Sequence, residues 1–199
     1  MKVLVFGADG RTGRHVTGFA IERGHQVRCF VREFGRLEHA DGVEVFSGDA
    51  RNGADIDPAV EGVEAIVSVL SLAKAEDEPA YSDATSTIVG AGERAGVGRI
   101  VITANNHAFN DDEVTGEFAA QAREHRRNRD TVRASSLDWT ILAAPWVTDD
   151  EPTGAYEAVL DAKGPSRRIP APDFGLACVD ALEHEDWLGH IVGVSSPPT

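Results

Sequence analysis

Three glycines near the start of the chain have the spacing and the neighbours of a phosphate-binding turn. Gly7, Gly10 and Gly13 follow the apolar run of residues 2–6 and lead into a helical pattern that begins near Arg11. A strand that enters a helix through residues without side chains brings a diphosphate onto backbone N–H groups, where the helix dipole adds partial positive charge. Glycine also allows the close approach that such a turn needs. This context predicts a dinucleotide site; a ligand-free glycine turn is the alternative.

Charged residues after the next two predicted strands bear on which dinucleotide binds. Arg32 follows the segment 26–31, where an acidic residue favours NAD and a cation favours the 2′-phosphate of NADP. Because a guanidinium grips phosphate through two hydrogen bonds, Arg32, with Arg36 further on, predicts NADP as the cofactor. Glu33 could instead hold the ribose hydroxyl, or pair with Arg32 in solvent. Asp49 could accept a hydrogen bond from the adenine amino group; a plain turn carboxylate is the other interpretation.

Few residues in the sequence could move a proton. Neither Tyr81 nor Tyr156 is followed at the fourth position by the lysine that lowers the pKa of a catalytic tyrosine in many dehydrogenases. Asn105, just past a predicted strand, could be a catalytic residue that orients a substrate carbonyl, or could cap the next element. His125 belongs to the basic run of residues 123–133, which could be a solvated face; the family resemblance described below implies instead that it is a second catalytic candidate.

The elements that must position these residues alternate between strand-like and helical patterns. Strands are expected at 2–6, 26–31, 43–46, 64–70, 99–103, 139–143 and 191–194, and helices at 11–23, 79–95, 113–134 and 172–184. This alternation predicts an α/β fold, a doubly wound parallel sheet (Rossmann fold) with helices on both faces. We expect one domain over 1–199, in which 145–172 is an irregular substrate-side loop region. Trp146 in that region could stack on a flat ligand or simply pack.

Composition excludes several classes of protein. The 33 acidic and 19 basic residues give a net charge of −14, which argues against a nucleic-acid partner. The acidic, lysine-poor surface suits a halophile, or else a GC-rich genome with an ordinary acidic surface. Cys29 and Cys178 lack ligand spacing and predict reduced thiols in a cytoplasmic protein, and no histidine pair has metal spacing. We expect no membrane span, a small-molecule substrate, and a monomer or weak dimer.

Several of these segments together resemble a known family. They are the turn 7–13, Val31–Arg32, Gly48–Asp49, 62–68, 137–142 and 187–193. They resemble the atypical short-chain dehydrogenases/reductases of the NAD(P)H-binding, NmrA-like group, and within it the flavin reductases of the biliverdin reductase B type. The resemblance implies a cofactor site formed by Gly7, Gly10, Arg11, Thr12, Gly13, Arg32, Arg36, Asp49, Leu70, Thr103 and Pro145.

The chain departs from the pattern of that group at three places. Asp9 replaces a common threonine, and we expect its carboxylate to turn away or to cap the helix. Asn105 stands where a serine lies near the nicotinamide, and residues 143–145 replace Arg-Pro-Pro. The leading prediction is an NADPH-dependent oxidoreductase that passes hydride to a flavin, a quinone or a tetrapyrrole. The alternatives are a non-catalytic NADP(H) redox sensor with a protein partner, and a sugar-nucleotide epimerase or dehydratase.

Overall fold

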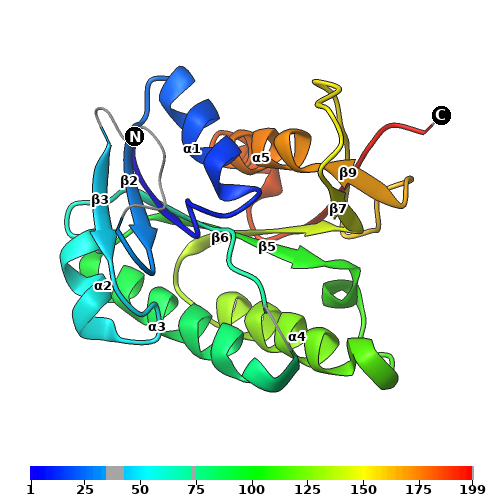
Figure 1. Ribbon diagram of the computed structural model, residues 1–199, viewed down its shortest axis with the longest axis horizontal. Helices are drawn as coiled ribbons and strands as arrows, with labels where there is room; N and C mark the ends of the chain where they lie inside the picture. The colour runs from blue at the N-terminus through cyan, green and yellow to red at the C-terminus, as the bar shows by residue number, and fades with distance from the viewer. Residues whose placement is uncertain (35–42, 73–74, 199) are drawn as a thin grey trace.

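The computed structural model describes residues 1–34, 43–72 and 75–198, and its centre is a twisted sheet (Figure 1). The strand order is β3-β2-β1-β4-β5-β6-β10-β8, and β8 runs antiparallel to its neighbour β10. The strands are β1 (Lys2–Phe6), β2 (Gln26–Val31), β3 (Glu44–Ser47), β4 (Ala65–Ser68), β5 (Arg99–Asn105), β6 (Asp138–Ala144), β8 (Glu157–Leu160) and β10 (Ile191–Ser195). The order 3-2-1-4-5-6 is that of a dinucleotide-binding fold, so the expected fold class is confirmed.

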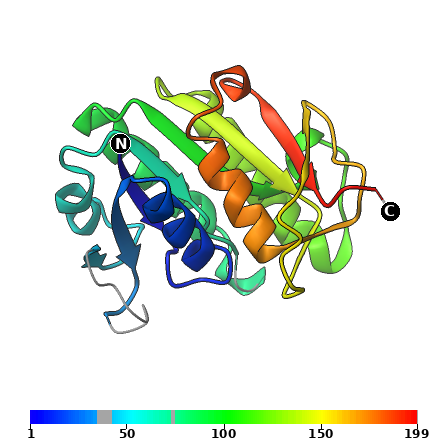
Figure 2. The same cartoon turned by 90° about the horizontal axis from the view of Figure 1, so that it is seen from above.

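Helices cover both faces of the sheet, as the nearly continuous apolar strands require. Helices α1 (Gly13–Glu22) and α5 (Ala171–Asp180) lie on one face; α2 (Gly53–Val60), α3 (Ala80–Ala95) and α4 (Ala119–Arg133) lie on the other (Figures 1 and 2). Because side chains alternate along β1, Val3 and Val5 join the core under α1 and α5. Leu4 and Phe6 join the core under α2 and α3. No helix among the described residues has the length and apolar character needed to cross a membrane.

The structure corrects two expectations about helices. The sequence analysis missed α2, an eight-residue helix that contains Pro58 and begins where the Asn52 side chain accepts a hydrogen bond from the Ala54 N–H at 3.1 Å. The helix expected from residue 113 begins at Ala119, after a single 3₁₀ turn (Gly116–Phe118). Gly116 has φ +73°, which a regular helix does not admit.

The segment 145–172 is also more regular than expected. It contains β8, which extends the main sheet, and the strands β7 (Trp146–Thr148) and β9 (Arg168–Pro170), which pair in parallel as a separate two-stranded sheet. Ile169 is fully buried in the core under α1 and α5, and Val147 packs against that core. Short strands separated by prolines and glycines show no clear period in the sequence, which is why the pattern indicated a loop.

Candidate functional site

The glycine turn joins β1 to α1 at the carboxyl edge of the sheet. Gly7 has φ +76°, and the Gly10 N–H donates to the Gly7 carbonyl oxygen at 2.9 Å. A Cβ on Gly13 would lie 2.0 Å from that same oxygen, so only glycine fits there. The expected glycine spacing therefore reflects a closed turn that depends on the lack of a side chain.

The start of α1 is open to an anion. The N-cap residue Thr12 makes no side-chain capping bond, and the first turn of the helix has no acidic residue. Among the described residues, no hydrogen-bond partner is present for the backbone N–H groups of Arg11, Thr12 and Gly13. Free N–H groups at the positive end of a helix are what a diphosphate needs, so this turn fits the diphosphate of a dinucleotide.

Asp9 does not cap this helix. No hydrogen bond from α1 to its carboxylate is present in the described part of the chain. Burial raises the pKa of the Cys29 thiol to about 11, and the nearby Asp9 carboxylate adds to that rise. The cap that the sequence offered for Asp9 is therefore not formed.

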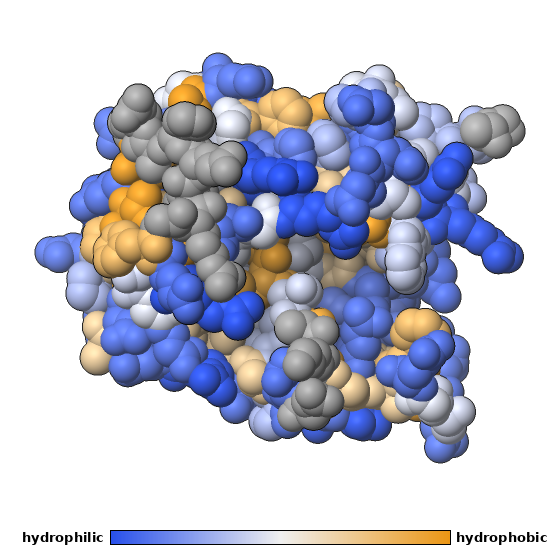
Figure 3. Space-filling model, in the orientation of Figure 1, coloured by the Kyte–Doolittle hydropathy of each residue, from blue (hydrophilic) through white to orange (hydrophobic). Residues whose placement is uncertain are grey.

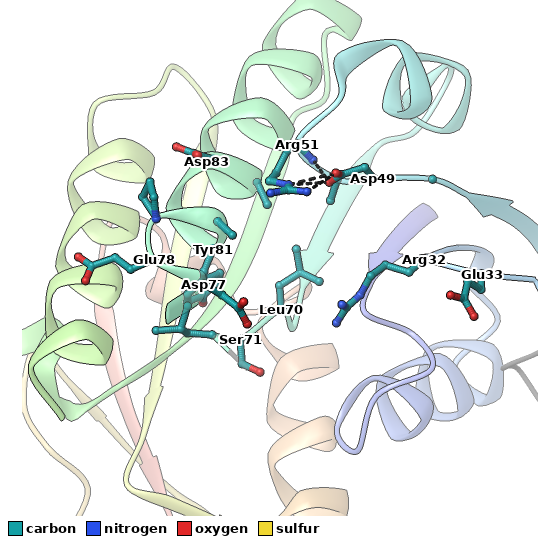
Figure 4. A pocket seen from close by; sticks show the side chains of 16 residues that line it. Arg32, Glu33, Asp49, Arg51, Leu70, Ser71, Asp77, Glu78, Tyr81 and Asp83 are labelled. Carbon is teal, nitrogen blue, oxygen red and sulfur yellow. Dashed lines mark hydrogen bonds and ion pairs between the residues drawn. The ribbon is translucent and has the colours of Figure 1, made fainter. Parts of the chain in front are cut away.

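A cavity of about 800 Å³ lies beside the turn, at the carboxyl ends of β2, β3 and β4 (Figure 4). Arg32, Asp49 and Leu70 line it, which brings together three of the residues expected in the cofactor site. A Cβ on Gly7 would lie 3.3 Å from the Leu70 Cδ2 atom, so the turn and the cavity share a wall. The face seen in Figure 3 is mostly hydrophilic, with hydrophobic atoms near its centre. Arg36 falls outside the described residues.

The two arginines of the cavity are placed differently. Arg32 is exposed, and Figure 4 shows its guanidinium reaching towards Leu70, with Glu33 on its other side. Arg51, which the sequence analysis did not single out, forms a two-pronged ion pair with Asp49. The side-chain hydrogen bonds from Arg51 hold the pKa of Asp49 below its ordinary value, and Arg32 adds to this effect. Asp49 is therefore an ionised acceptor at neutral pH.

Tyr81 is a further cavity residue that the sequence did not indicate. It lies at the start of α3, and its hydroxyl donates to the Thr103 carbonyl oxygen at 2.8 Å. Burial raises its pKa, so it stays protonated. Thr103 points inward, where its hydroxyl lies 3.4 Å from the Ser68 carbonyl oxygen. Only the fold, which places α3 against the end of β5, brings these residues together.

The two candidate catalytic residues have different surroundings. The Asn105 side chain accepts a hydrogen bond from the His107 N–H at 2.9 Å and so caps the turn after β5. In the register of β5 and β6, Asn105 lies opposite Ala144, next to Pro145. His125 is only 5% exposed and packs edge-on against Tyr81, with ring centroids 5.4 Å apart. Burial lowers the pKa of His125 to about 3, so the ring is neutral at pH 7. Catalytic roles for both residues stay predictions.

The basic run of α4 is internally paired. Arg127 pairs with Glu124 at 2.8 Å, and Arg129 pairs with Asp130 at 2.7 Å. Arg126 donates to the carbonyl oxygens of Asn110 and Asp112. The first two pairs lie within the helix, and the bonds of Arg126 join it to the segment that precedes it.

Together, the strand order, the glycine turn and the adjoining cavity define a dinucleotide-binding Rossmann domain. Comparison with known proteins is more specific: residues 7–185 match the NAD(P)H-binding family, and the chain belongs to that family.

The curated relatives with named activities include a dehydrogenase and a reductase. A 3-β-hydroxysteroid dehydrogenase of Mycolicibacterium neoaurum is 34% identical over 117 residues, which cover 53% of this chain and 32% of that protein. The chain thus spans about a third of the length of that relative. A (4-alkanoyl-5-oxo-2,5-dihydrofuran-3-yl)methyl phosphate reductase of Streptomyces griseus is 28% identical over 207 residues, covering 98% of this chain and 68% of the relative.

Solved structures share the fold. A short-chain dehydrogenase/reductase from Veillonella parvula in complex with NADP has a TM-score of 0.82 at 19% identity, covering 100% of this chain and 95% of that one. ChuY, an anaerobilin reductase from Escherichia coli O157:H7, has a TM-score of 0.82 at 20% identity, covering 100% and 98%. These likenesses support the Rossmann fold.

Proposed function

We propose that this protein is an NADPH-dependent oxidoreductase of the atypical short-chain type that reduces a flat conjugated acceptor: a flavin, a quinone or a tetrapyrrole. The observation that carries the proposal is the shared wall between the glycine turn and the cavity that holds Arg32 and Asp49. These two parts adjoin at Leu70, so the turn would accept the diphosphate at α1 and the cavity the adenosine phosphate beside β2 and β3.

The residues of this site would divide the work of binding. The N–H groups of Arg11, Thr12 and Gly13 would hold the diphosphate, and the Arg32 guanidinium the 2′-phosphate. Asp49 would accept the adenine amino group. Bound NADPH supplies the hydride, and a conjugated acceptor needs little acid–base help.

On the acceptor side, Asn105 and Pro145 lie at neighbouring strand ends, and Trp146 follows directly. Trp146 is 69% exposed, which leaves its ring available to stack on a flat acceptor. The anaerobilin reductase of Escherichia coli and the dihydrofuranylmethyl phosphate reductase of Streptomyces griseus support a reductive role. Asn105 would orient the acceptor or the nicotinamide amide.

A redox sensor that binds NADP(H) without turnover is the second candidate. It is favoured by the neutral, buried state of His125 and by the protonated, buried Tyr81, because neither group exchanges a proton near pH 7. In this role the cofactor site would be the same, and the segment 145–172 would change its contacts with a protein partner.

One assay separates the two candidates. The protein is incubated with NADPH and then with FMN, a soluble quinone or biliverdin, and loss of the nicotinamide absorbance band is followed. Turnover with any of these acceptors supports the reductase. Tight NADPH binding without turnover across the panel overturns it in favour of the sensor.

A further inference from the structure

The loop between β3 and α2 is fixed by its own hydrogen bonds. The Asp49 N–H donates to the Asp55 side chain at 2.9 Å, and the Asn52 N–H donates to the Asp49 carbonyl oxygen at 2.8 Å. A Cβ on Gly48 would lie 2.6 Å from the Asp55 Cβ atom, so the loop packs tightly on the start of α2. The backbone that carries Asp49 and Arg51 is therefore held in place from two sides.

Arg51 fixes the Asp49 side chain in turn. Its Nε atom lies 3.0 Å from Oδ1 and 3.1 Å from Oδ2, and its Nη2 atom lies 2.6 Å from Oδ2. The Arg51 backbone N–H also donates to Oδ1, at 2.9 Å. A carboxylate offers about four lone-pair sites. The one Nε hydrogen is shared between the two oxygens and lies slightly closer to Oδ1. Three donor hydrogens therefore occupy three of the four sites, two on Oδ1 and one on Oδ2, which leaves one acceptor site on Oδ2.

Asp49 and Arg51 both line the cavity, and Figure 4 shows them together on its upper wall, with Arg32 entering from another strand end. Arg32 and Arg51 both act electrostatically on the Asp49 carboxylate. The wall therefore presents a fixed, ionised oxygen that can accept a hydrogen bond and cannot donate one.

We propose that Arg51 is a positioning residue that orients Asp49 to accept an exocyclic amino group, so that the cavity selects an aminopurine over a purine with a carbonyl group at that position. This inference rests on the proposed dinucleotide function. An exocyclic amino group of the base can donate to the remaining site on Asp49 Oδ2. A carbonyl oxygen at the same position of the base cannot donate, so this oxygen and Oδ2 would face each other as two acceptors without a hydrogen between them. Selectivity for the base thus depends on the orientation of one side chain.

The inference assigns Arg51 and Arg32 different tasks. Arg32 would read the 2′-phosphate, which distinguishes NADPH from NADH. Arg51 pairs with Asp49 through two donors. Loss of Arg51 should therefore weaken binding of the adenine ring, and by the same factor for NADPH and NADH. The Arg51 guanidinium keeps three further N–H donors outside this pair. The comparison of NADPH with NADH therefore decides whether any of them also reaches the phosphate.

The test measures dissociation constants for NADPH, NADH and their hypoxanthine analogues, in which a carbonyl replaces the adenine amino group. The protein variants are the wild type, Arg51→Ala and Arg51→Lys. Arg94→Ala is the matched control, because Arg94 pairs with Asp57 at 2.8 Å, is similarly exposed and does not line the cavity.

The wild type should bind NADPH roughly tenfold or more tightly than its hypoxanthine analogue, as expected for a hydrogen bond to a charged group. Arg51→Ala should bring that ratio close to one and weaken NADPH and NADH by the same factor. Arg51→Lys, which keeps the charge and loses the two-pronged geometry, should lie between. Arg94→Ala should match the wild type. Melting curves confirm that each variant is folded.

Two results would overturn the inference while leaving the proposed function intact. One is a folded Arg51→Ala variant that keeps the full preference for adenine. The other is a variant that loses affinity for NADPH alone, which would make Arg51 a phosphate contact. A wild type that binds none of the four dinucleotides would overturn the proposed function itself.

Discussion

The two ends of the proposed site differ in how they are held. The cofactor end is the glycine turn with Asp49, and the acceptor end is the region around Trp146. At the cofactor end, backbone bonds close the glycine turn, and Asp49 is held by Arg51 and by the loop that starts α2. At the acceptor end, Trp146 stands exposed on a separate two-stranded sheet, and the pairs that reach it are loose: Arg168 lies 3.9 Å from Asp150, and both are exposed. If the proposed function holds, the dinucleotide would meet a preformed surface, whereas the acceptor would meet exposed side chains that can adapt to it.

The largest expected effect comes from closing the turn with a side chain. In Gly13→Ala, the new Cβ would overlap the Gly7 carbonyl oxygen, so the turn must open and withdraw its N–H groups. We expect NADPH affinity to fall roughly a hundredfold or more, since several hydrogen bonds to a charged group are lost. Calorimetric titration measures this loss.

Gly18→Ala is the matched control for that change. It lies in the same helix, and no atom lies within 4 Å of the new Cβ. This variant should keep its NADPH affinity and gain up to about 1 kcal/mol of unfolding free energy from helix propensity. Equal affinities for the Gly13 and Gly18 variants would contradict a preformed cofactor end.

The buried histidine behind the site should make stability depend on pH. The pKa of His125 falls from 6.5 to about 3 because of burial, so the unfolded chain binds a proton that the folded chain does not. Stability should therefore fall as the pH drops from 6.5 towards 3, by up to about 1.4 kcal/mol per pH unit from this group. His125→Gln and His125→Phe should lose that component in urea titrations across this range. An unchanged slope in both would mean that the ring is not buried.

A smaller effect should separate the acceptor end from the cofactor end. Trp146→Ala removes a stacking surface worth about 0.5–1.5 kcal/mol, so kcat/KM for FMN should fall roughly two- to tenfold. NADPH affinity should not change, and the exposed Leu160 on β8 offers a control in Leu160→Ala. An equal loss of NADPH affinity in the tryptophan variant would show that the two ends are one unit.

The smallest expected effect is that of salt on the melting temperature, which concerns the whole surface and neither end of the site in particular. The net charge of −14 is self-repelling, and salt screens it. If the surface is adapted to salt, about 1 kcal/mol of relief would raise the melting temperature by roughly 2–4 °C between low salt and molar KCl. A flat or falling melting temperature would favour an ordinary acidic surface from a GC-rich genome.

The glycine turn and the strand ends beside it could be predicted from the sequence more readily than the short strands of 145–172, for a physical reason. Gly7, Gly13 and Arg32 act through local geometry at strand ends, which spacing reveals. Tyr81 reaches the cavity only because α3 packs against β5, so no local pattern marks it. The short strands β7, β8 and β9 depend on pairing between segments distant in the chain, and the pattern of 145–172 therefore indicated a loop.

Arg51 lies between residues that local spacing reveals and residues that only the tertiary fold brings to the site. It lies two residues after Asp49, so its position on the same loop was visible in the sequence. Its pairing with the Asp49 carboxylate depends on the bend of the loop, which the bonds to Asp55 and Asn52 create. A charged residue two positions from a candidate contact is the signal that could have identified it.

The most direct measurement is a calorimetric titration of the wild type and Arg32→Ala with NADPH and NADH. The proposal requires the wild type to bind NADPH well over tenfold more tightly than NADH. Arg32→Ala should remove most of that difference, about 1.5–3 kcal/mol for a hydrogen bond to a charged group. Equal affinities of the wild type for the two dinucleotides would contradict the NADP assignment. A site that stays empty at millimolar concentrations of both would contradict the account as a whole.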